Sequence, residues 1–155
     1  MFGKRFTLFR LFGFDVRIDL SWVFIAVLVT WSLATGLFPH YYPNLSTTMY
    51  WIMGAIGAIG LFASIIIHEF SHSLVARQFG QPMKGITLFI FGGVAEMEDE
   101  PPSPKAELLM ALAGPAISLV IGGIAVGAMA AGWTENLPVI ARGLIGYVGF
   151  INIVV

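Results

Sequence analysis

The residues best suited to chemistry are His68, Glu69 and His72, which form the pattern H-E-x-x-H. On a helix the two histidines lie one turn apart and about 40° from each other around the axis, with Glu69 on the same side. Two imidazoles so placed can hold one Zn²⁺, and the carboxylate can reach a water on the metal. The chain has no cysteine, so zinc must be held by histidine and carboxylate.

The elements that must position these residues are membrane helices. Of the 155 residues, 57% are hydrophobic and only 11% are charged, whereas a soluble domain carries about 25% charged residues. Ionisable groups within a membrane are rare and usually functional, which favours a metal site over the alternatives of a buried histidine pair or a helix end in water. A net charge of −1 argues against a nucleic-acid partner. We therefore predict an α-helical integral membrane protein.

Four apolar segments predict about four transmembrane helices. They are Leu20–Phe38, Met49–Gln78, Pro104–Ala131 and Val139–Val155. Ser46 or Thr47 is expected to cap the second helix, which carries the H-E-x-x-H near its end, and Ser103 is expected to cap the third. The fourth helix is still running at Val155, so we expect residues 1–155 to be a membrane-embedded core that stops within a span.

Small residues in these helices predict close packing rather than a ligand site. Glycines that would let another helix approach are Gly54, Gly57 and Gly60 in the second helix and Gly123 and Gly127 in the third. Gly114-Pro115 predicts a kink in the third helix, because proline removes a backbone donor.

The N-terminal residues predict one strand and an orientation. Residues 14–19 alternate between apolar and charged side chains, which is the period of a half-buried strand. The basic residues that precede the first apolar segment are Lys4, Arg5, Arg10 and Arg17. The following loop has none, so the positive-inside rule places the N-terminus and residues 78–104 in the cytoplasm, and residues 39–49 and 132–138 outside.

A β-hairpin is predicted between the second and third helices. Ile86–Phe91 is a β-prone run, Gly92-Gly93 is a turn signal, and Val94–Glu96 can return as a second strand. The segment is too short to span a bilayer. It is either a re-entrant hairpin, which must be surrounded by protein or a wet cavity, or an ordinary surface hairpin.

These elements suit peptide-bond hydrolysis without a covalent intermediate. Zinc lowers the pKa of a bound water and polarises a carbonyl, and Glu69 would take the proton from the water and pass it to the leaving amine. A transmembrane substrate must first unwind, because its carbonyls are hydrogen-bonded within a helix. The Ile86–Phe91 strand could accept the unwound chain by β-addition.

The third zinc ligand is expected beyond Val155. The carboxylates that follow the hairpin are in or beside an aqueous, proline-rich loop, and none lies on a spanning helix. They are Glu96, Glu98, Asp99 and Glu100.

The sequence resembles the site-2 protease family of intramembrane zinc metalloproteases. The resemblance rests on H-E-F-S-H, on F-G-G-V-A at Phe91–Ala95, on A-G-P at Ala113–Pro115 and on R-I-D-L-S-W at Arg17–Trp22. It implies that His68 and His72 bind zinc and that Glu69 is the catalytic acid/base.

The resemblance also implies a substrate path and a cellular setting. The residues expected to line that path are Ile90, Phe91, Gly92, Gly93 and Val94. The family's L-D-G motif, whose Asp is the third ligand, is not in this chain, and there is no PDZ-like insert. We expect a Zn²⁺-dependent, multi-pass protein of a prokaryotic cell membrane that cuts transmembrane substrates, with homo-oligomerisation left open.

Two other functions fit the motif. One is a membrane H-E-x-x-H protease of another family, such as a prenyl-protein protease. The other is a non-enzymatic protein, either a metal transporter or an inactive scaffold, for which changing Glu69 to Gln would not abolish function.

Overall fold

The computed structural model describes residues 5–11, 13–81, 83–89, 92–97 and 102–154. In chain order the elements are β1 (Arg5–Leu11), β2 (Phe14–Asp19), α1 (Ser21–Ser32), the π-helical segment η1 (Leu33–Leu37), α2 (Phe38–Tyr41), α3 (Thr47–Gln78), β3 (Met83–Phe89), β4 (Gly92–Met97), α4 (Pro104–Ala130) and α5 (Val139–Val154). The chain divides into two compact units, residues 1–25 with 65–117 and residues 26–64 with 118–155.

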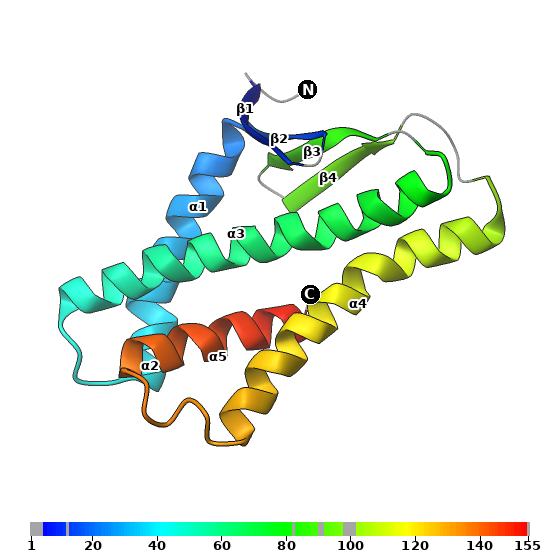
Figure 1. Ribbon diagram of the computed structural model, residues 1–155. Coiled ribbons are helices and arrows are strands. Elements are labelled where there is room, and N and C mark those ends of the chain that lie inside the picture. The colour runs from blue at the N-terminus through cyan, green and yellow to red at the C-terminus, as the bar shows by residue number, and fades with distance from the viewer. Residues whose placement is uncertain (1–4, 12, 82, 90–91, 98–101, 155) are drawn as a thin grey trace. The chain divides into compact units, whose positions relative to one another are not determined.

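The first unit contains a four-stranded sheet in the order β1-β2-β3-β4 (Figure 1). The central pair, β2 and β3, is parallel, and both outer pairs are antiparallel. The predicted N-terminal strand is confirmed as β2, whereas β1 was not predicted. Both β2 and β3 are therefore internal strands, and the two edges of the sheet are β1 and β4.

The predicted hairpin is present, but its turn is not at the predicted residues. β3 and β4 are antiparallel, with Phe89 opposite Gly92 and Leu88 opposite Gly93. Placing the turn at Gly92-Gly93 was therefore wrong, because both glycines are in β4. Residues 90–91, between the two strands in the sequence, are outside the described residues. The assignment of Ile86–Phe91 as a free edge was also wrong, because β2 occupies the other side of β3.

One face of the sheet packs on the helix that carries the H-E-x-x-H. The apolar residues Phe14, Val16, Ile86 and Leu88 are buried, as expected for alternate positions on one side of paired strands. The ring of Phe14 meets the ring of Phe70 in α3 edge-on, at a centroid distance of 5.5 Å. Burial of these side chains removes apolar area from water and holds the sheet against α3.

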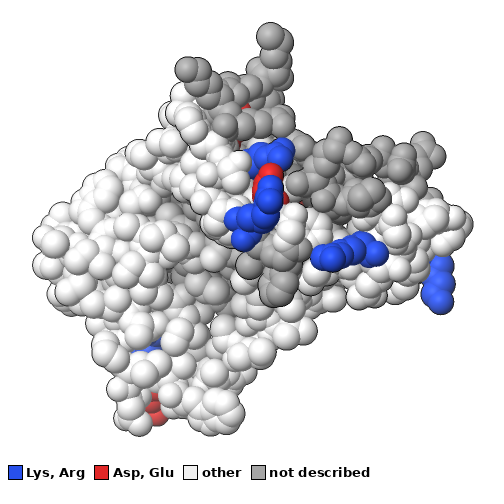
Figure 2. Space-filling view, turned by 45° about the horizontal axis from the view of Figure 1, so that its top comes forward, with Lys and Arg blue, Asp and Glu red and all other residues white. Residues whose placement is uncertain are grey.

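Among the described residues, three helices are long and apolar enough to cross a membrane: Ser21–Tyr41, Thr47–Gln78 and Pro104–Ala130. α5 is apolar, and its 16 residues, Val139–Val154, reach the end of the described residues. The fourth predicted span therefore stays a prediction. Large apolar side chains on the long helices are exposed, and Figure 2 shows a surface made mostly of uncharged residues. Such exposure is expected where lipid, not water, surrounds the helices.

Both predicted serine caps are confirmed. The hydroxyl of Ser46 accepts a hydrogen bond from the backbone N–H of Met49 at 3.2 Å, and the hydroxyl of Ser103 accepts one from the N–H of Ala106 at 3.2 Å. Each bond satisfies a backbone donor that has no partner within the helix. α4 continues through Pro115, which lies inside the helix.

The second unit has its own apolar core of Leu33, Phe38, Met53 and Tyr147. The close approaches predicted at Gly54, Gly57 and Gly60 are confirmed. A Cβ at these three positions would lie 2.6 Å from the carbonyl oxygen of Thr30, 2.9 Å from Leu33 and 2.9 Å from Val148, respectively. Glycine therefore lets neighbouring segments approach α3 at each turn.

The packing role predicted for Gly123 and Gly127 was wrong for the described residues. A Cβ at either position would have no atom within 4 Å. The close approach occurs instead at Gly122, where a Cβ would lie 3.0 Å from the carbonyl oxygen of Gly149 in α5. Adjacent residues of a helix point about 100° apart around its axis. The face that carries Gly123 and Gly127 is therefore not the face of α4 that packs against α5 through Gly122.

A buried polar contact also joins α3 and α5 in this unit. The amide nitrogen of Asn152 donates to the hydroxyl of Ser64 at 2.8 Å and to the carbonyl oxygen of Val148 at 2.9 Å. Hydrogen bonds between helices are a usual source of specificity where apolar burial alone does not drive association.

Candidate metal centre

The candidate site lies entirely within the first unit. His68, Glu69 and His72 are in the C-terminal part of α3, and all three side chains are partly buried. The imidazole rings of His68 and His72 lie 4.9 Å apart between centroids, at an interplanar angle of 70°. The helical spacing therefore brings the two rings together on one face, as the sequence predicted.

Gly114 of α4 forms the opposite wall of this site. A Cβ at position 114 would overlap Nε2 of His68 and Nε2 of His72. The two nitrogen atoms therefore converge on one small volume that only a glycine leaves open. Convergent imidazole nitrogens are what a tetrahedral zinc ion requires from two of its ligands.

A hydrogen bond from the same part of α4 orients one of the rings. Nδ1 of His72 lies 2.5 Å from the carbonyl oxygen of Met110. A carbonyl oxygen can only accept, so Nδ1 carries the proton and donates. In a neutral ring with the proton on Nδ1, Nε2 carries the lone pair, and this atom faces Gly114. Metal-binding histidines usually donate their other ring nitrogen in this way, which fixes the tautomer and the ring orientation.

Glu69 lies against the sheet. A Cβ at Gly93 of β4 would lie 2.8 Å from Cγ of Glu69 and 3.2 Å from Cγ2 of Ile65. The backbone of β4 therefore passes directly over the carboxylate side chain. Because β4 is an edge of the sheet, an extended chain that paired with it would be held near Glu69.

The structure brings together four of the site residues expected from the sequence: His68, Glu69, His72 and Gly93. Gly92 is also in β4, opposite Phe89. Val94 is in the same strand, opposite Thr87, whereas Ile90 and Phe91 are outside the described residues.

Two contributors were missed from the sequence. Met110 acts through its carbonyl group, which every residue has, so no sequence signal could have marked it. Gly114 was interpreted as part of a kink. Its place in A-G-P, within an apolar helix, was the available signal that the position needs a residue without a side chain.

The side chains present fit a zinc ion but do not complete its coordination. Two convergent Nε2 atoms, one of them with its tautomer set, and a nearby carboxylate suit zinc chemistry. In the part of the chain that the structure describes, no group of three or more His, Cys, Asp or Glu side chains is placed to hold a metal ion. A third ligand outside these residues remains a prediction.

The fold and the site define a helical membrane protein with an H-E-x-x-H centre between α3, α4 and an edge strand. The model of peptidase family M50 matches residues 56–151, which include the site. The chain therefore belongs to peptidase family M50. This membership excludes the alternative of an H-E-x-x-H protease from another family.

The names of individual relatives are consistent with this family assignment. A Synechocystis protein provisionally named zinc metalloprotease sll0528 is 43% identical over 143 residues, which cover 92% of this chain and 36% of the relative. Rip3 of Mycobacterium tuberculosis, provisionally named a zinc metalloprotease, is 43% identical over 112 residues, or 72% of this chain and 28% of that protein. The chain thus spans about a third of the length of these relatives.

A solved structure has the same fold. The site-2 protease from Methanocaldococcus jannaschii matches with a TM-score of 0.63 and 27% identity, over 97% of this chain and 65% of that one. The similarity covers both units, so the architecture described above is that of a site-2 protease core.

Proposed function

We propose that this chain is the core of an intramembrane zinc endopeptidase that hydrolyses peptide bonds of transmembrane substrates. The observation that carries the proposal is the convergence of the two Nε2 atoms of His68 and His72 at Gly114, with Glu69, the residue after His68, against Gly93 of β4. Family membership and the zinc metalloprotease names of the relatives support it.

In this proposal His68 and His72 hold the ion, and a carboxylate outside the described residues completes its coordination. When bound, zinc would supply a Lewis acid that polarises the scissile carbonyl and favours ionisation of water. Glu69 takes the proton of the attacking water and delivers it to the departing amine nitrogen. Met110 and Gly114 keep the imidazoles oriented, so that little reorganisation is needed during the reaction.

Substrate recognition is proposed at the edge strand β4, in place of the β3 edge expected from the sequence. A helical substrate hides its carbonyl groups in hydrogen bonds and must become extended before water can attack. β4 is an edge strand of the sheet formed by the described residues, and Gly93 places that strand against Glu69. An added substrate strand would gain main-chain hydrogen bonds while its scissile bond lay near the carboxylate.

The proposal also includes how the chain crosses the membrane and which side its N-terminus faces. The three long helices and α5 would each cross the bilayer, with the N-terminus in the cytoplasm of a prokaryotic cell. The hairpin of β3 and β4 would lie at membrane depth, shielded by protein. The side assignment rests on the basic residues near the N-terminus.

The decisive experiment is Glu69→Gln in the full-length protein. Glutamine cannot take a proton from water, so cleavage of a transmembrane peptide in proteoliposomes should fall by about 10²-fold or more. Bound zinc, measured by elemental analysis, should remain at the wild-type level because Glu69 is not a ligand. Near wild-type cleavage by a zinc-loaded variant would remove Glu69 from this role.

The remaining alternative is a non-enzymatic metal-binding protein. It predicts that the zinc-loaded wild-type protein cleaves none of the tested peptides and that Glu69→Gln leaves its cellular function intact. Membership of peptidase family M50 and the zinc metalloprotease names of the relatives favour the enzyme.

A further inference from the structure

We infer that a pocket in the second unit binds the ring of a lipid-soluble quinone. The pocket has a volume of about 280 Å³ and lies between α5 and the end of the first apolar segment, near α2 (Figure 1). Its lining consists of three tyrosines, one phenylalanine, one leucine and two glycines, all within the second unit. None of these residues belongs to the candidate metal centre, so the inference does not depend on the proposed chemistry.

The two glycines form a flat wall of the pocket. Gly143 and Gly146 are three residues apart in α5 and therefore share one face of the helix. A Cβ at position 143 would lie 3.1 Å from Cε2 of Tyr42, so the ring of Tyr42 packs closely against the backbone of α5. A Cβ at position 146 would lie 3.8 Å from the hydroxyl oxygen of Tyr42. The absence of side chains leaves a surface on which a planar ring can lie.

The opposite wall, formed by the end of the first apolar segment, is held in place before any ligand binds. The hydroxyl of Tyr50 donates to the carbonyl oxygen of Tyr42 at 2.8 Å and accepts from the backbone N–H of Leu45 at 3.1 Å. Leu37, which lines the pocket, is the last residue of the π-helical segment η1. Turns of this kind are rare and are often found at functional sites. The π-helical turn is therefore an independent indication that the pocket has a function.

The tyrosine hydroxyls favour a ligand that accepts hydrogen bonds. Tyr147 is only 8% exposed, and its ring packs edge-on against Phe38 at a centroid distance of 5.9 Å. Within the described residues, no hydrogen bond is formed by its hydroxyl or by the hydroxyls of Tyr41 and Tyr42. A buried hydroxyl without a partner is costly. A carbonyl oxygen of the ligand would accept from Tyr147 and remove this cost.

The lining also restricts the charge, shape and size of the ligand. Among the described residues that line the pocket none is charged, which disfavours a phospholipid headgroup because a buried charge needs a partner. Aromatic rings suit a planar conjugated ring, whereas an acyl chain would leave the hydroxyls unpaired. The volume is close to the lower limit of about 300 Å³ for small-molecule pockets.

A quinone combines these properties, because its ring is planar and uncharged and carries two carbonyl acceptors. Only the ring fits within the volume. Its apolar tail would extend into lipid past Tyr41 and Phe150, which line the pocket and are 69% and 60% exposed.

Binding is tested with the full-length protein in vesicles of synthetic phosphatidylcholine, which contain no quinone. Radiolabelled decylubiquinone should bind saturably, after correction for uptake by protein-free vesicles. Tyr147→Phe keeps the ring that contacts Phe38 and removes one donor, so it should weaken binding about fivefold, the effect of one hydrogen bond. Unchanged affinity in this variant, with wild-type thermal unfolding in the absence of ligand, would overturn the inference.

A matched pair of glycine variants tests the location. Gly146→Leu puts a side chain into the pocket and should weaken binding by more than about tenfold. Gly127→Leu in α4 is the control, because Gly127 does not line the pocket and a Cβ there would meet no atom within 4 Å. The control should bind the quinone like the wild type. Equal affinity in the two variants would mean that the quinone binds elsewhere.

A competitor without carbonyl groups tests the class of ligand. Decylbenzene has the same ten-carbon tail and should not displace the labelled quinone at concentrations at which unlabelled decylubiquinone does. Full displacement by decylbenzene would show that the pocket accepts any hydrocarbon. Absence of saturable quinone binding to the wild type would show that another segment of the chain or a lipid fills the pocket. Either result would contradict the proposal.

Discussion

Gly114 in α4 lies so close to His72 in α3 that a Cβ at position 114 would overlap Nε2 of the imidazole. The same added atom would overlap Nε2 of His68. The backbone of α4 therefore forms one wall of the site, and the space beside it is available to a metal only because residue 114 has no side chain.

The first prediction is that Gly114→Ala weakens zinc binding by about 10- to 100-fold, the usual effect of disturbing groups that support metal ligands. The added methyl group must displace one or both imidazoles. Zinc affinity of the full-length protein, measured by competition with a chelating dye, checks this.

Gly123→Ala in the same helix is the matched control. A Cβ there meets no atom within 4 Å, and alanine is the better helix former. Equal zinc affinity in both variants would show that the space at Gly114 is not where the metal binds.

The second prediction is that Gly93→Ala lowers peptide cleavage while zinc stays bound. The new Cβ would lie 2.8 Å from Cγ of Glu69, so the carboxylate must move away from its working position. The three atoms nearest to this Cβ belong to Glu69 and Ile65, so the histidines should keep the metal. Parallel assays of cleavage and zinc content check the prediction, and loss of both together would contradict it.

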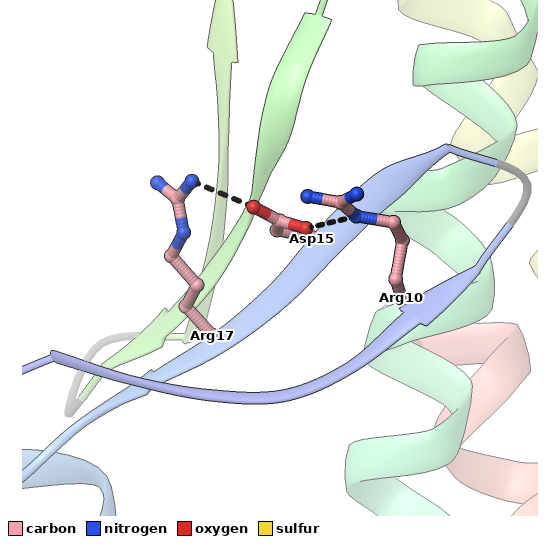
Figure 3. A network of polar contacts seen from close by, with 3 residues as sticks. All are labelled: Arg10, Asp15 and Arg17. Atoms are coloured by element: carbon pink, nitrogen blue, oxygen red, sulfur yellow. Dashed lines mark hydrogen bonds and ion pairs between the residues drawn. The ribbon is translucent and has the colours of Figure 1, made fainter.

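The third prediction concerns the stability of the sheet at low pH. The hydrogen bond from Arg10, which has the larger effect, and the hydrogen bond from Arg17 lower the pKa of Asp15 below its ordinary value of 3.8 (Figure 3). A carboxylate with a lowered pKa stabilises the folded state fully above its unfolded pKa, and this contribution disappears as the pH falls through the folded pKa. The contribution is small because the pair is near the surface.

The measurement compares thermal unfolding of the wild type and Asp15→Asn, in detergent, at neutral pH and well below pH 3.8. The wild type should be the more stable at neutral pH, and the difference should vanish in acid. A difference that persisted in acid would mean that Asp15 does not act through its charge.

The fourth prediction concerns membrane orientation. Pro43 and Pro102 are both exposed on the protein surface. Single cysteines introduced at these positions are treated with a membrane-impermeant thiol reagent on intact cells. Label at position 43 and none at position 102 is expected from the positive-inside rule. The reverse pattern would invert the assignment.

Much of this protein could be predicted from its sequence, because the signals are local. Residues 47–78 form a long, mostly apolar run, which predicts a membrane helix. The period of 3.6 residues then places His68 and His72 on one face of that helix. The ring contact between His68 and His72 needs nothing beyond that helix. The serine caps at positions 46 and 103 are equally local.

What only the tertiary structure decided involves residues distant in the chain. The parallel pairing of β2 with β3 joins residues 15–18 to 85–88, and it makes β4 the edge strand beside Glu69. The hydrogen bond from His72 to Met110 spans 38 positions. Such pairings depend on backbone groups that are alike in every residue and on the packing of whole elements, so no residue type marks them in advance.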